Sequence, residues 1–440
     1  MGHFVPHTDA EVAEMLAFMG LSSADELFAA VPAALRLAGG LAMPPGLSEP
    51  DVAAEMARLA GANAVLPELV CFAGGGIYDH EVPSAVRSLQ FRSEFVTAYT
   101  PYQAEVAQGV LQLLFEYQTM VARLAGVEVA NASLYDGATA LVEGVNLAVA
   151  ATGRHRVLVS RGVNPTWRAV LATFAGGTGH ELVDVPLSDG VTAWPDAGEA
   201  GAIVVQYPNY LGCLEDVAAA RAAADRAGAL LVVAADPVAA GVLRTPGSQG
   251  ADVVVGEGQP FGTPLSFGGP ALGLFACRLA HVRRLPGRLV GETVDVEGRR
   301  AYVTTLRTRE QDIRREKASS NVCTNQTLIA VGCAIQLAWL GTAGLRELAL
   351  RCARGTRYAR EALLAVDGVE PLAAAPVLRE FAVRTPLPAA TVVERMADEG
   401  FLAGIPLGDD YGDGLLVAVT ERRTKAEIDR FAEALEKVVR

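Results

Sequence analysis

Four short runs of apolar, mostly β-branched residues in the middle of the chain constrain its fold more than any other feature. They are RVLVS at 156–160, AIVVQ at 202–206, ALLVVAA at 229–235 and DVVVG at 252–256. Each run is apolar on both faces, and segments of helical length separate the runs. Strands that are buried on both faces and joined by helices form parallel sheets. We therefore predict an α/β fold with a mostly parallel sheet covered by helices.

The segments before and after these runs predict smaller parts of the chain. Thr8 is placed to cap a first helix and Ser23 a second helix that ends near Val31, and a proline-rich linker follows at 43–50. Alternating helical and extended patterns after Asn321 predict a compact α+β domain. The expected parts are a helical N-terminal arm and linker over 1–90, a large α/β domain over 91–320 and a smaller α+β C-terminal domain over 321–440.

Composition and charge exclude several classes of protein. The 440 residues carry a net charge of −13, which argues against sequence-independent binding of nucleic acid, because such binding needs cationic residues. Apolar runs such as 328–340 are too short and too often interrupted by polar residues to span a bilayer. The N-terminal residues include acids where a signal peptide would be basic. We expect a soluble, cytoplasmic protein with no nucleic-acid or membrane partner.

The cysteines and histidines give no sign of a metal site. The six cysteines show no CxxC spacing, and no two of the six histidines have the spacing of zinc ligands. Free, buried thiols are the simpler interpretation, and we expect no metal.

Lysine is absent from the first 316 residues, where the main α/β core should lie. The lysines are Lys317, Lys425 and Lys437, and arginine supplies the other 34 of the 37 basic side chains. On a protein surface, replacement of lysine by arginine is usually tolerated. A guanidinium, however, stays protonated and cannot attack a carbonyl as a lysine amine does. If the protein works with an aldehyde cofactor, we expect the amine to come from another chain.

Open parallel sheets bind ligands where the strands end, so the residues after each run are candidate site residues. Asp236 follows the third run and is placed to hold a protonated pyridine nitrogen, although an Asx turn before a proline is an alternative. After the fourth run, where a fold of this kind presents a Schiff-base lysine, the chain has Glu257, Gln259 and Pro260. In NASLYDGATALVEG the first helix amides are suited to a phosphate, but Asp136 already offers them a carboxylate.

Long segments of the chain resemble the glycine-cleavage-system P-protein family, the pyridoxal-phosphate-dependent glycine dehydrogenases (decarboxylating). The similarity is strongest to subunit 1 of enzymes that are split into two polypeptides, and it covers most of 65–350. The matching segments are RSEFVTAYTPYQAEVAQGVLQLLFEYQTM from Arg92, NASLYDGATAL from Asn131, VVQYPNYLGCLED from Val204, GADVVVGEGQPFGTPLSFGGP from Gly250, LPGRLVGETVD from Leu285 and LRTREQDIRREKASSNVCTNQ from Leu306. The chain departs from the family pattern at Asn164, where a histidine is common, and at Ala73, Ile77 and Tyr78 in a glycine-rich segment.

The resemblance implies a fold-type-I pyridoxal-phosphate transferase architecture in which this chain pairs with a homologous subunit 2. That partner would carry the Schiff-base lysine and bind most of the pyridoxal 5'-phosphate, and the pair would double to an α2β2 heterotetramer. Together the subunits would decarboxylate glycine and transfer the aminomethyl group to the lipoyl arm of the H-protein. In this chain Asp136, Asp236 and Gln259 would be vestigial cofactor positions.

Enzymes of this fold type build their active sites at the dimer interface, so we expect this chain to lend a loop to its partner. RSEFVTAYTPYQ is the best candidate, because its aromatic rings, hydroxyls and amide suit a small zwitterion. The alternatives are a strand end packed on a helix and, for the first charged pair, a simple surface ion pair. The candidate side chains are Tyr99, Thr100, Tyr102 and Gln103, supported by Arg92 and Glu94.

A basic segment, RTREQDIRREKASSN, stands out from the acidic composition. Arg314, Arg315 and Lys317 are placed to contact the acidic lipoyl carrier protein, or the segment is only a solvated helix. Two other functions stay open at this point. One is a structural or regulatory pseudo-subunit that contributes no active-site residue, and the other is a self-sufficient lyase that uses Lys317 as its base.

Overall fold

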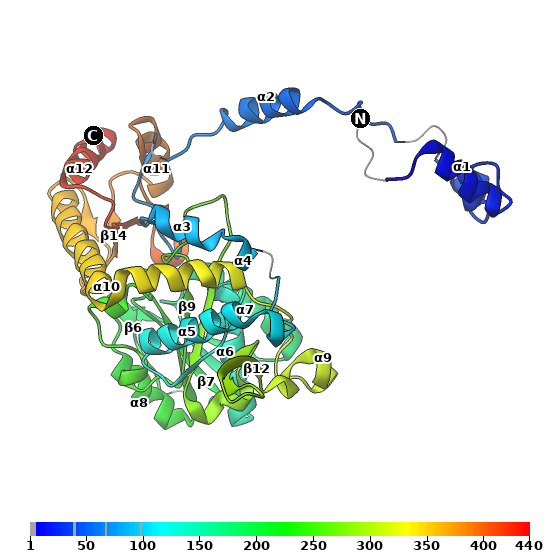
Figure 1. Ribbon diagram of the computed structural model, residues 1–440. Coiled ribbons are helices and arrows are strands. Elements are labelled where there is room, and N and C mark those ends of the chain that lie inside the picture. The colour runs from blue at the N-terminus through cyan, green and yellow to red at the C-terminus, as the bar shows by residue number, and fades with distance from the viewer. Residues whose placement is uncertain (1–5, 38–40, 67, 97–98, 197) are drawn as a thin grey trace. The chain divides into compact units, whose positions relative to one another are not determined.

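The computed structural model describes the whole chain except residues 1–5, 38–40, 67, 97–98 and 197 (Figure 1). The chain divides into two compact units, Met1–Ala64 and Val65–Arg440. The first unit contains α1 (Asp9–Phe18) and α2 (Glu49–Ala60), and neither helix has a buried residue.

The expected cap of α1 is confirmed, whereas the second expected helix is not an α-helix. Thr8 and Glu11 form a reciprocal capping box at the start of α1. Ser23 precedes a short 3-10 helix, Ala24–Phe28, and its side chain makes no capping hydrogen bond. The carboxylate of Glu26 instead accepts a hydrogen bond from the backbone N–H of Ser22, so this turn is closed by an acid rather than by the serine.

The second unit begins at Val65, upstream of the boundary that the sequence suggested at residue 90. The reason is a long-range strand pair: β1 (Val70–Cys71) runs parallel to β15 (Phe401–Leu402) near the C-terminus. This pairing ties the segment that follows the arm to the end of the chain. A two-residue strand gives no periodicity that the sequence could reveal.

A seven-stranded sheet forms the centre of this unit, and its order is β2-β10-β9-β8-β7-β3-β4. The strands from β9 to β4 are parallel, as expected, while β10 runs antiparallel to both of its neighbours, β9 and β2. The four apolar runs of the sequence are confirmed as β3, β7, β8 and β9. The strand bounds are β2 (Val129–Ala130), β3 (Arg156–Ser160), β4 (Glu181–Val185), β7 (Ala202–Tyr207), β8 (Leu230–Ala235), β9 (Val253–Glu257) and β10 (Gly273–Cys277).

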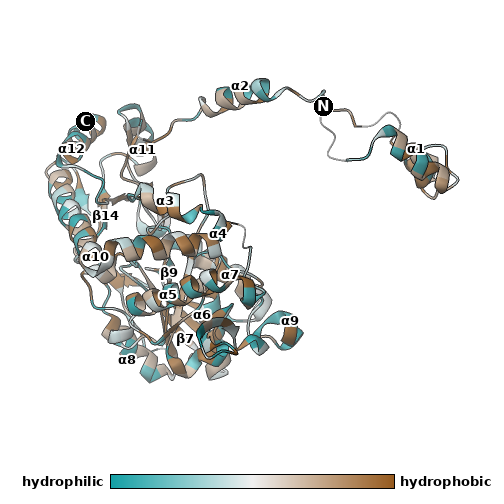
Figure 2. Ribbon diagram, in the orientation of Figure 1, coloured by the Kyte–Doolittle hydropathy of each residue, from teal (hydrophilic) through white to brown (hydrophobic). Residues whose placement is uncertain are grey.

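Helices cover both faces of this sheet, and the strands are hydrophobic along much of their length (Figure 2). Side chains alternate along each strand, so Ile203 and Val205 of β7 face one core while Val204 faces the other. The first core is shared with α5, α8 and α10, and the second with α6 and α7. The helix bounds are α5 (Gln108–Ala125), α6 (Gly137–Thr152), α7 (Pro165–Thr178), α8 (Val217–Ala227) and α10 (Thr327–Leu364).

Helix α10 is the one helix among the described residues that is long and apolar enough to cross a membrane. Its helical geometry is interrupted at Gly341, with φ 58° and ψ −174°. Before this break Ala330, Cys333 and Ala334 are buried in the core shared with α5. Its apolar composition therefore serves the packing of the large domain.

The C-terminal part is a four-stranded antiparallel sheet packed against helices, as the sequence predicted. Its strand order is β13-β14-β17-β16. A capping box of Thr424 and Glu427 begins α12. The element bounds are β13 (Glu370–Pro371), β14 (Glu380–Arg384), α11 (Ala389–Asp398), β16 (Ile405–Pro406), β17 (Leu415–Ala418) and α12 (Lys425–Val439).

Smaller elements connect these parts. A hairpin of β11 and β12 follows the antiparallel edge of the sheet, and β5 and β6 form a second short pair. Their bounds, with the remaining short helices, are α3 (Ser84–Gln90), α4 (Ser93–Val96), β5 (Leu187–Ser188), β6 (Val191–Thr192), β11 (Leu289–Val294), β12 (Arg300–Thr305) and α9 (Gln311–Arg314).

The contact between the large domain and β14 generates a first prediction. Gly212, at φ 80°, lies so close to Glu380 that an added Cβ would overlap the Glu380 carbonyl oxygen. Gly153 has a similar φ of 69° and open space around it. We expect Gly153→Ala to cost about 1–2 kcal/mol for its left-handed backbone alone. Gly212→Ala should cost at least about 2 kcal/mol more, because of overpacking. Urea unfolding of both variants measures the difference, and equal losses would contradict this packing.

Candidate functional site

At the carboxyl end of β8 the acidic side chain forms an ion pair and is not a free carboxylate. Asp236 follows β8, and its Oδ2 lies 2.8 Å from Nη2 of Arg379, the residue before β14. Both side chains are largely buried, with exposures of 13% and 4%. Burial by itself lowers the pKa of Arg379, but Asp236 and the other acidic groups around the guanidinium together outweigh it, so the pKa is raised. Oδ1 of Asp236 also accepts from the N–H of Val238, so the Asx turn weighed from the sequence is present too.

Arg379 lies at the centre of a wider network. Its guanidinium carbon lies 3.5 Å from the centre of the Tyr78 ring, and its Nη1 donates to Nε2 of His80 at 2.5 Å. Nδ1 of His80 lies 2.6 Å from a carboxylate oxygen of Glu421. Because Nε2 must accept from a guanidinium, the imidazole carries its proton on Nδ1 and donates it to Glu421. The network thus runs from Asp236 through Arg379 and His80 to Glu421.

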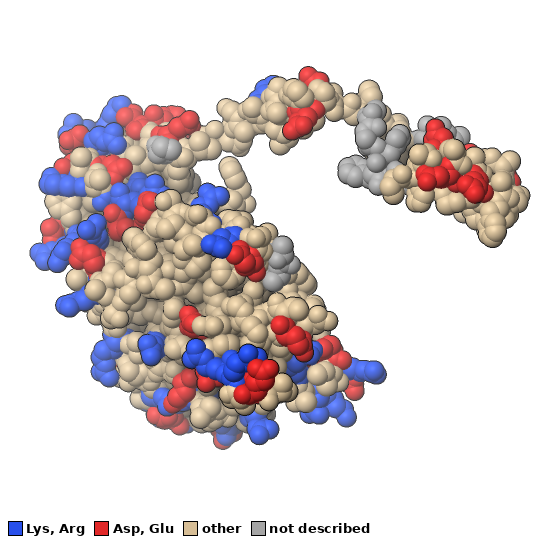
Figure 3. Space-filling model, in the orientation of Figure 1, with Lys and Arg blue, Asp and Glu red and all other residues tan. Residues whose placement is uncertain are grey.

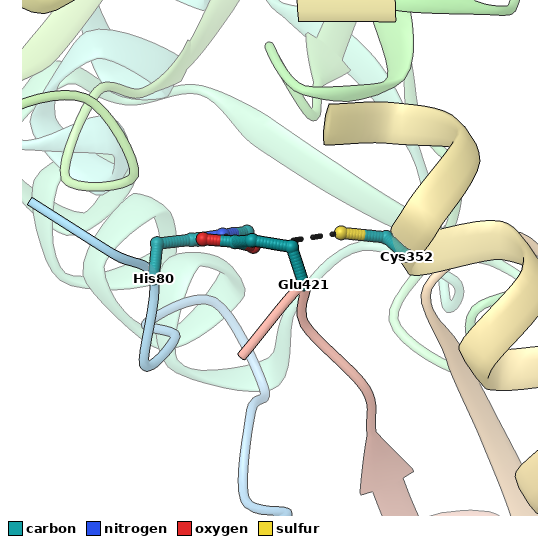
Figure 4. Close-up of side chains that lie close together, drawn as sticks. All are labelled: His80, Cys352 and Glu421. Atoms are coloured by element: carbon teal, nitrogen blue, oxygen red, sulfur yellow. Dashed lines mark hydrogen bonds and ion pairs between the residues drawn. The ribbon is translucent and has the colours of Figure 1, made fainter. Parts of the chain in front are cut away.

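His80, Cys352 and Glu421 come from three separate segments, with Cys352 presented by α10 (Figure 4). Their possible ligand atoms lie within 4.8 Å of one another, which is compatible with a metal ion by distance alone. A guanidinium directly behind the imidazole would repel a cation, and Cys352 Sγ is already in contact with Glu421 at 3.8 Å. Burial raises the pKa of Cys352 to about 12, so the thiol stays protonated. We assign the cluster to the ion-pair network.

Tyr78 and Glu380 complete the network on the side of β14. The Tyr78 hydroxyl donates to Oε2 of Glu380 at 2.7 Å, and the backbone N–H of Gly75 donates to Oε1 at 2.7 Å. Burial raises the pKa of Glu380, and Arg379 acts against this rise. The glycine-rich segment before α3 is therefore bound to the C-terminal sheet through a fully enclosed carboxyl group.

Glu257 and Gln259 fill the position after β9 where the fold would present a lysine. The carboxylate of Glu257 accepts from the N–H groups of Gly137, Gln259 and Leu272 at 2.8–3.0 Å. Burial raises the pKa of Glu257 to about 7, while these three donors act in the opposite direction. Gln259 is held by hydrogen bonds in both directions with the backbone of Tyr78. No side chain with a nucleophilic nitrogen stands at this position.

The start of α6 is already satisfied by groups of the chain itself. Asp136 caps the helix by accepting from the N–H of Thr139 at 2.8 Å, as predicted, and Glu257 accepts from the N–H of Gly137. Trp167 packs against Gly137 so closely that a Cβ there would overlap the indole ring. A phosphate would have to displace two carboxylates and an aromatic ring.

These residues do not fit a pyridoxal phosphate bound by this chain alone. The cavity that remains at the carboxyl ends of β7, β8 and β9 has a volume of ≈ 40 Å³ and is lined by Tyr78, Asp236, Glu257 and Arg379, among others. Ligand sites for small molecules usually measure roughly 300–1,000 Å³. The space, the missing amine and the capped helix all disagree with a cofactor site.

The loop that we expect this chain to lend lies at the surface. Tyr99 and Tyr102 are 73% and 66% exposed, and Gln103 is exposed as well. Thr100 is half-buried, and its Oγ1 is enclosed without a hydrogen-bond partner. A packed strand end would bury both tyrosines, so the exposure of these two rings leaves them free to contact a second molecule.

Arg92 and Glu94 form a surface ion pair, which is the alternative interpretation of these two residues. Their charged atoms are 2.5 Å apart, and both side chains are 58% exposed. The hydrogen bonds from Arg92 lower the pKa of Glu94 to about 2.

The basic segment is a series of short turns rather than one helix. Arg309 is buried and donates to the carbonyl oxygens of Leu285, Leu306 and Gly287. Arg314, Arg315 and Lys317 are exposed. In Figure 3 basic side chains gather at the end of the second unit that carries α9. The turns thus leave three cations free at the surface.

The sequence did not predict the residues that contact Asp236 in this network. Tyr78 and its glycine-rich surroundings were noted only as a departure from a family pattern, and Arg379, Glu380 and Glu421 gave no local signal. Asn164, the other departure, caps α7 by accepting from the N–H of Thr166 and donates to the Gly75 carbonyl oxygen. Both departures lie around the filled cavity.

Solved structures define the class of this fold. A sphingosine-1-phosphate lyase from Burkholderia pseudomallei superposes with a TM-score of 0.60 at 17% identity, covering 93% of this chain and 94% of that chain. A NifS-like protein from Rickettsia africae superposes with a TM-score of 0.62 at 12% identity, covering 84% and 99%. At this identity the likeness shows the fold alone. It is the fold of type-I pyridoxal-phosphate enzymes, as predicted.

A closer set of relatives defines the family. The family model described as "Glycine cleavage system P-protein" matches residues 2–435, and this chain belongs to that family. The probable glycine dehydrogenases (decarboxylating) subunit 1 of Desulforamulus reducens and Moorella thermoacetica are 45% and 48% identical, each over 440 residues. These alignments cover 98% of this chain and 99% and 98% of the relatives. A crystal structure of an inhibitor-bound glycine decarboxylase (P-protein) superposes with a TM-score of 0.94 at 48% identity, covering 99% of this chain and 100% of that chain.

The Arg379–Asp236 pair generates a second prediction. Arg379→Gln leaves a carboxylate without its cation in a largely buried position, and we expect the free energy of unfolding to fall by about 3–5 kcal/mol. Arg357→Gln removes an arginine from an exposed pair with Glu361 and should change stability little. Chemical denaturation of both variants makes the comparison. Similar small losses would show that the buried pair contributes no more than a surface pair.

Proposed function

We propose that this chain is subunit 1, the subunit without the Schiff base, of a glycine decarboxylase of the glycine cleavage system. Membership of the P-protein family supports the reaction class. The observation that carries the specific role is Glu257, held by three backbone N–H groups where the catalytic lysine would stand. A chain with this fold and this filled cavity needs a second chain to supply the amine.

The partner in this proposal is a homologous, lysine-bearing subunit 2. It holds most of the pyridoxal 5'-phosphate, and the two chains form a heterodimer that doubles to an α2β2 heterotetramer in the cytoplasm. The relatives named subunit 1 support the existence of such a partner. The substrate is glycine, and the lipoyl arm of the H-protein accepts the aminomethyl group.

Within this assembly, the residues of this chain bind and orient. Tyr99, Thr100, Tyr102 and Gln103 form the loop lent to the partner's site, and their exposure supports this role. The ion pair of Arg92 and Glu94 lies just before the loop and limits the freedom of its first turn. Arg314, Arg315 and Lys317 offer cations to an acidic carrier protein.

Cofactor chemistry of the separated subunits tests the proposal first. The isolated chain, incubated with pyridoxal 5'-phosphate and borohydride, should gain no covalent adduct beyond weak labelling of its exposed lysines, because Glu257 and not a lysine stands at the end of β9. The lysine-bearing subunit 2 is the positive control and should be labelled. An adduct on this chain that Lys317→Arg abolishes would support the self-sufficient lyase instead.

Activity of the assembled pair tests the lent loop. In the complex with subunit 2, Tyr99→Phe and Tyr102→Phe should each lower kcat/KM for glycine-dependent CO2 exchange by about tenfold, the effect of losing one hydrogen bond to a charged group. Phe174→Ala, on the exposed surface of α7, is the matched control and should leave the rate unchanged. Full activity of both tyrosine variants, with assembly intact, would favour a purely structural subunit.

A further inference from the structure

A cavity of ligand size opens beside the break in α10 and is separate from the filled cavity at the ends of the strands. Its volume is ≈ 370 Å³, compared with ≈ 40 Å³ for the filled cavity. The two share no lining residue in the part of the chain that the structure describes. Sites for small molecules usually measure roughly 300–1,000 Å³. Of these two cavities, the one beside α10 has room for an organic molecule.

One face of α10 forms a wall of this cavity. Gln336, Leu340, Gly344 and Leu348 follow one another at intervals of four residues, and all four line the cavity. The helical geometry breaks at Gly341, between the second and the third of them. Gly344 has no side chain to fill the middle of this row. The sequence of α10 therefore leaves free space on a helix face that side chains would otherwise cover.

Hydrogen bonds hold the polar part of the lining in position. Oε1 of Gln336 accepts from the N–H of Gly262 at 2.6 Å, and its Nε2 donates to the carbonyl oxygen of Glu81 at 3.2 Å. The N–H of Glu81 donates to the carboxylate of Glu421 at 2.7 Å, and Nδ1 of His80 lies 2.6 Å from the same carboxylate. These groups are thus pre-organised before any ligand arrives.

The lining carries more negative than positive charge. Glu81, Glu347 and Glu421 supply three carboxylates and Arg351 one guanidinium, which leaves a formal charge of −2. Burial by itself raises the pKa of Glu421, but the hydrogen bonds from His80 and from the backbone outweigh it, so the pKa is lowered. Glu421 is therefore ionised at neutral pH. A lining of this kind attracts cations and repels anions.

Glu421 has no cation in direct contact with it, although its side chain is only 12% exposed. The groups that contact its carboxylate are the imidazole of His80, the N–H of Glu81 and the thiol of Cys352, and all three are neutral (Figure 4). Arg379 lies one step further away, behind the imidazole. A largely buried carboxylate with neutral partners is stabilised by an ammonium group that reaches it from the cavity.

Trp339 adds aromatic surface at the open side of the cavity. This residue lines the cavity and is 61% exposed. The face of an indole ring is the strongest aromatic partner for a cation. Pro83, Leu340 and Leu348 add apolar side chains to the same lining. The cavity thus offers carboxylates and a ring to a charged group, and hydrocarbon to the remainder of a ligand.

We propose that this cavity binds a small organic cation, an ammonium group on an apolar body. The carboxylates of Glu421 and Glu347 and the ring of Trp339 hold the ammonium group, while Leu340 and Leu348 contact the apolar part. The charge of the lining disfavours an anion of the same size, and a neutral molecule leaves Glu421 without a counter-charge. The site lies outside the cofactor position and does not depend on the proposed function.

Three ligands that share one ring but differ in charge test the site. The isolated full-length chain is titrated by calorimetry with benzylammonium, benzyl alcohol and benzoate. We expect benzylammonium to bind at least roughly tenfold more tightly than the alcohol, the effect of a hydrogen bond to a charged group. Benzoate should bind no more tightly than the alcohol. The proposal is overturned if benzylammonium does not bind, or if either of the other two binds as tightly.

Two glutamates on α10 provide matched variants that locate the ligand. Glu347 pairs with Arg351 and Glu361 with Arg357, at 2.9 and 2.8 Å and with the same spacing of four residues. Of the two glutamates, Glu347 lines the cavity. We expect Glu347→Gln to weaken benzylammonium binding roughly threefold, as for a partly exposed charge, and Glu361→Gln to leave it unchanged. Equal affinities of these two variants would place the ligand elsewhere and overturn the proposal.

The aromatic contact is tested by Trp339→Ala. Because the ring is largely exposed, the melting temperature should stay near that of the wild type. We expect benzylammonium to bind this variant at least roughly threefold more weakly, the effect of losing a cation–π contact. Wild-type affinity in the folded variant would overturn the assignment of the ammonium group to this cavity.

The complex with subunit 2 shows whether the cavity stays open in the assembled protein. We expect benzylammonium to bind the complex about as tightly as the isolated chain. Loss of binding in the complex would mean that the partner covers the cavity, and it would overturn the proposal of a small-molecule site. An inactive complex would count against the proposed function, while these titrations would still decide the cation site.

Discussion

The buried ion pair between Arg379 and Asp236 is the interaction on which the rest of the candidate site depends. It joins the residue that follows β8 in the large domain to the residue that precedes β14 in the C-terminal part. Its geometry places the guanidinium on the Tyr78 ring and against His80. Without that cation, Asp236 would be an unpaired charge, and His80 and Tyr78 would lose the group between them.

The filled cavity gives the shortage of lysine a more specific meaning. Most of the missing amines are replaced by arginine on the surface, where either side chain is tolerated. The absence of lysine matters at the position after β9. There Glu257 accepts hydrogen bonds from the backbone of α6 and of its own loop. The fold of a cofactor enzyme is therefore kept while its ligand space is occupied by protein groups. In the proposed pair, one subunit is specialised for holding the cofactor and the other for shape and contact.

Local patterns in the sequence predicted the parts of the fold that local forces determine. The runs that became β3, β7, β8 and β9 were recognisable because strands buried on both faces are apolar at every position. The capping boxes of α1 and α12 follow from a hydroxyl and an acid three residues apart. The strands β1 and β2 have two residues each and are too short for any periodicity. The predicted helix cap at Ser23 was wrong because the carboxylate of Glu26 accepts a hydrogen bond within the same turn.

The sequence also located one half of each long-range interaction in the site. Asp236 and Asp136 were identifiable from their places after a strand and before a helix. Their environments were not, because Arg379 and Tyr78 come from distant segments. Exposure of Tyr99 and Tyr102 could not be inferred either, since tyrosine is often half-buried.

The network around Arg379 also determines how late in synthesis this part of the protein can fold. His80 lies 299 positions from Arg379 and 341 positions from Glu421. Contacts between such distant positions form late, because the intervening chain must first be ordered. A nascent chain therefore carries the glycine-rich segment before α3 without its final partners until almost the whole polypeptide has been made. Closure of the cavity has to wait until both Arg379 and Glu421 have been made.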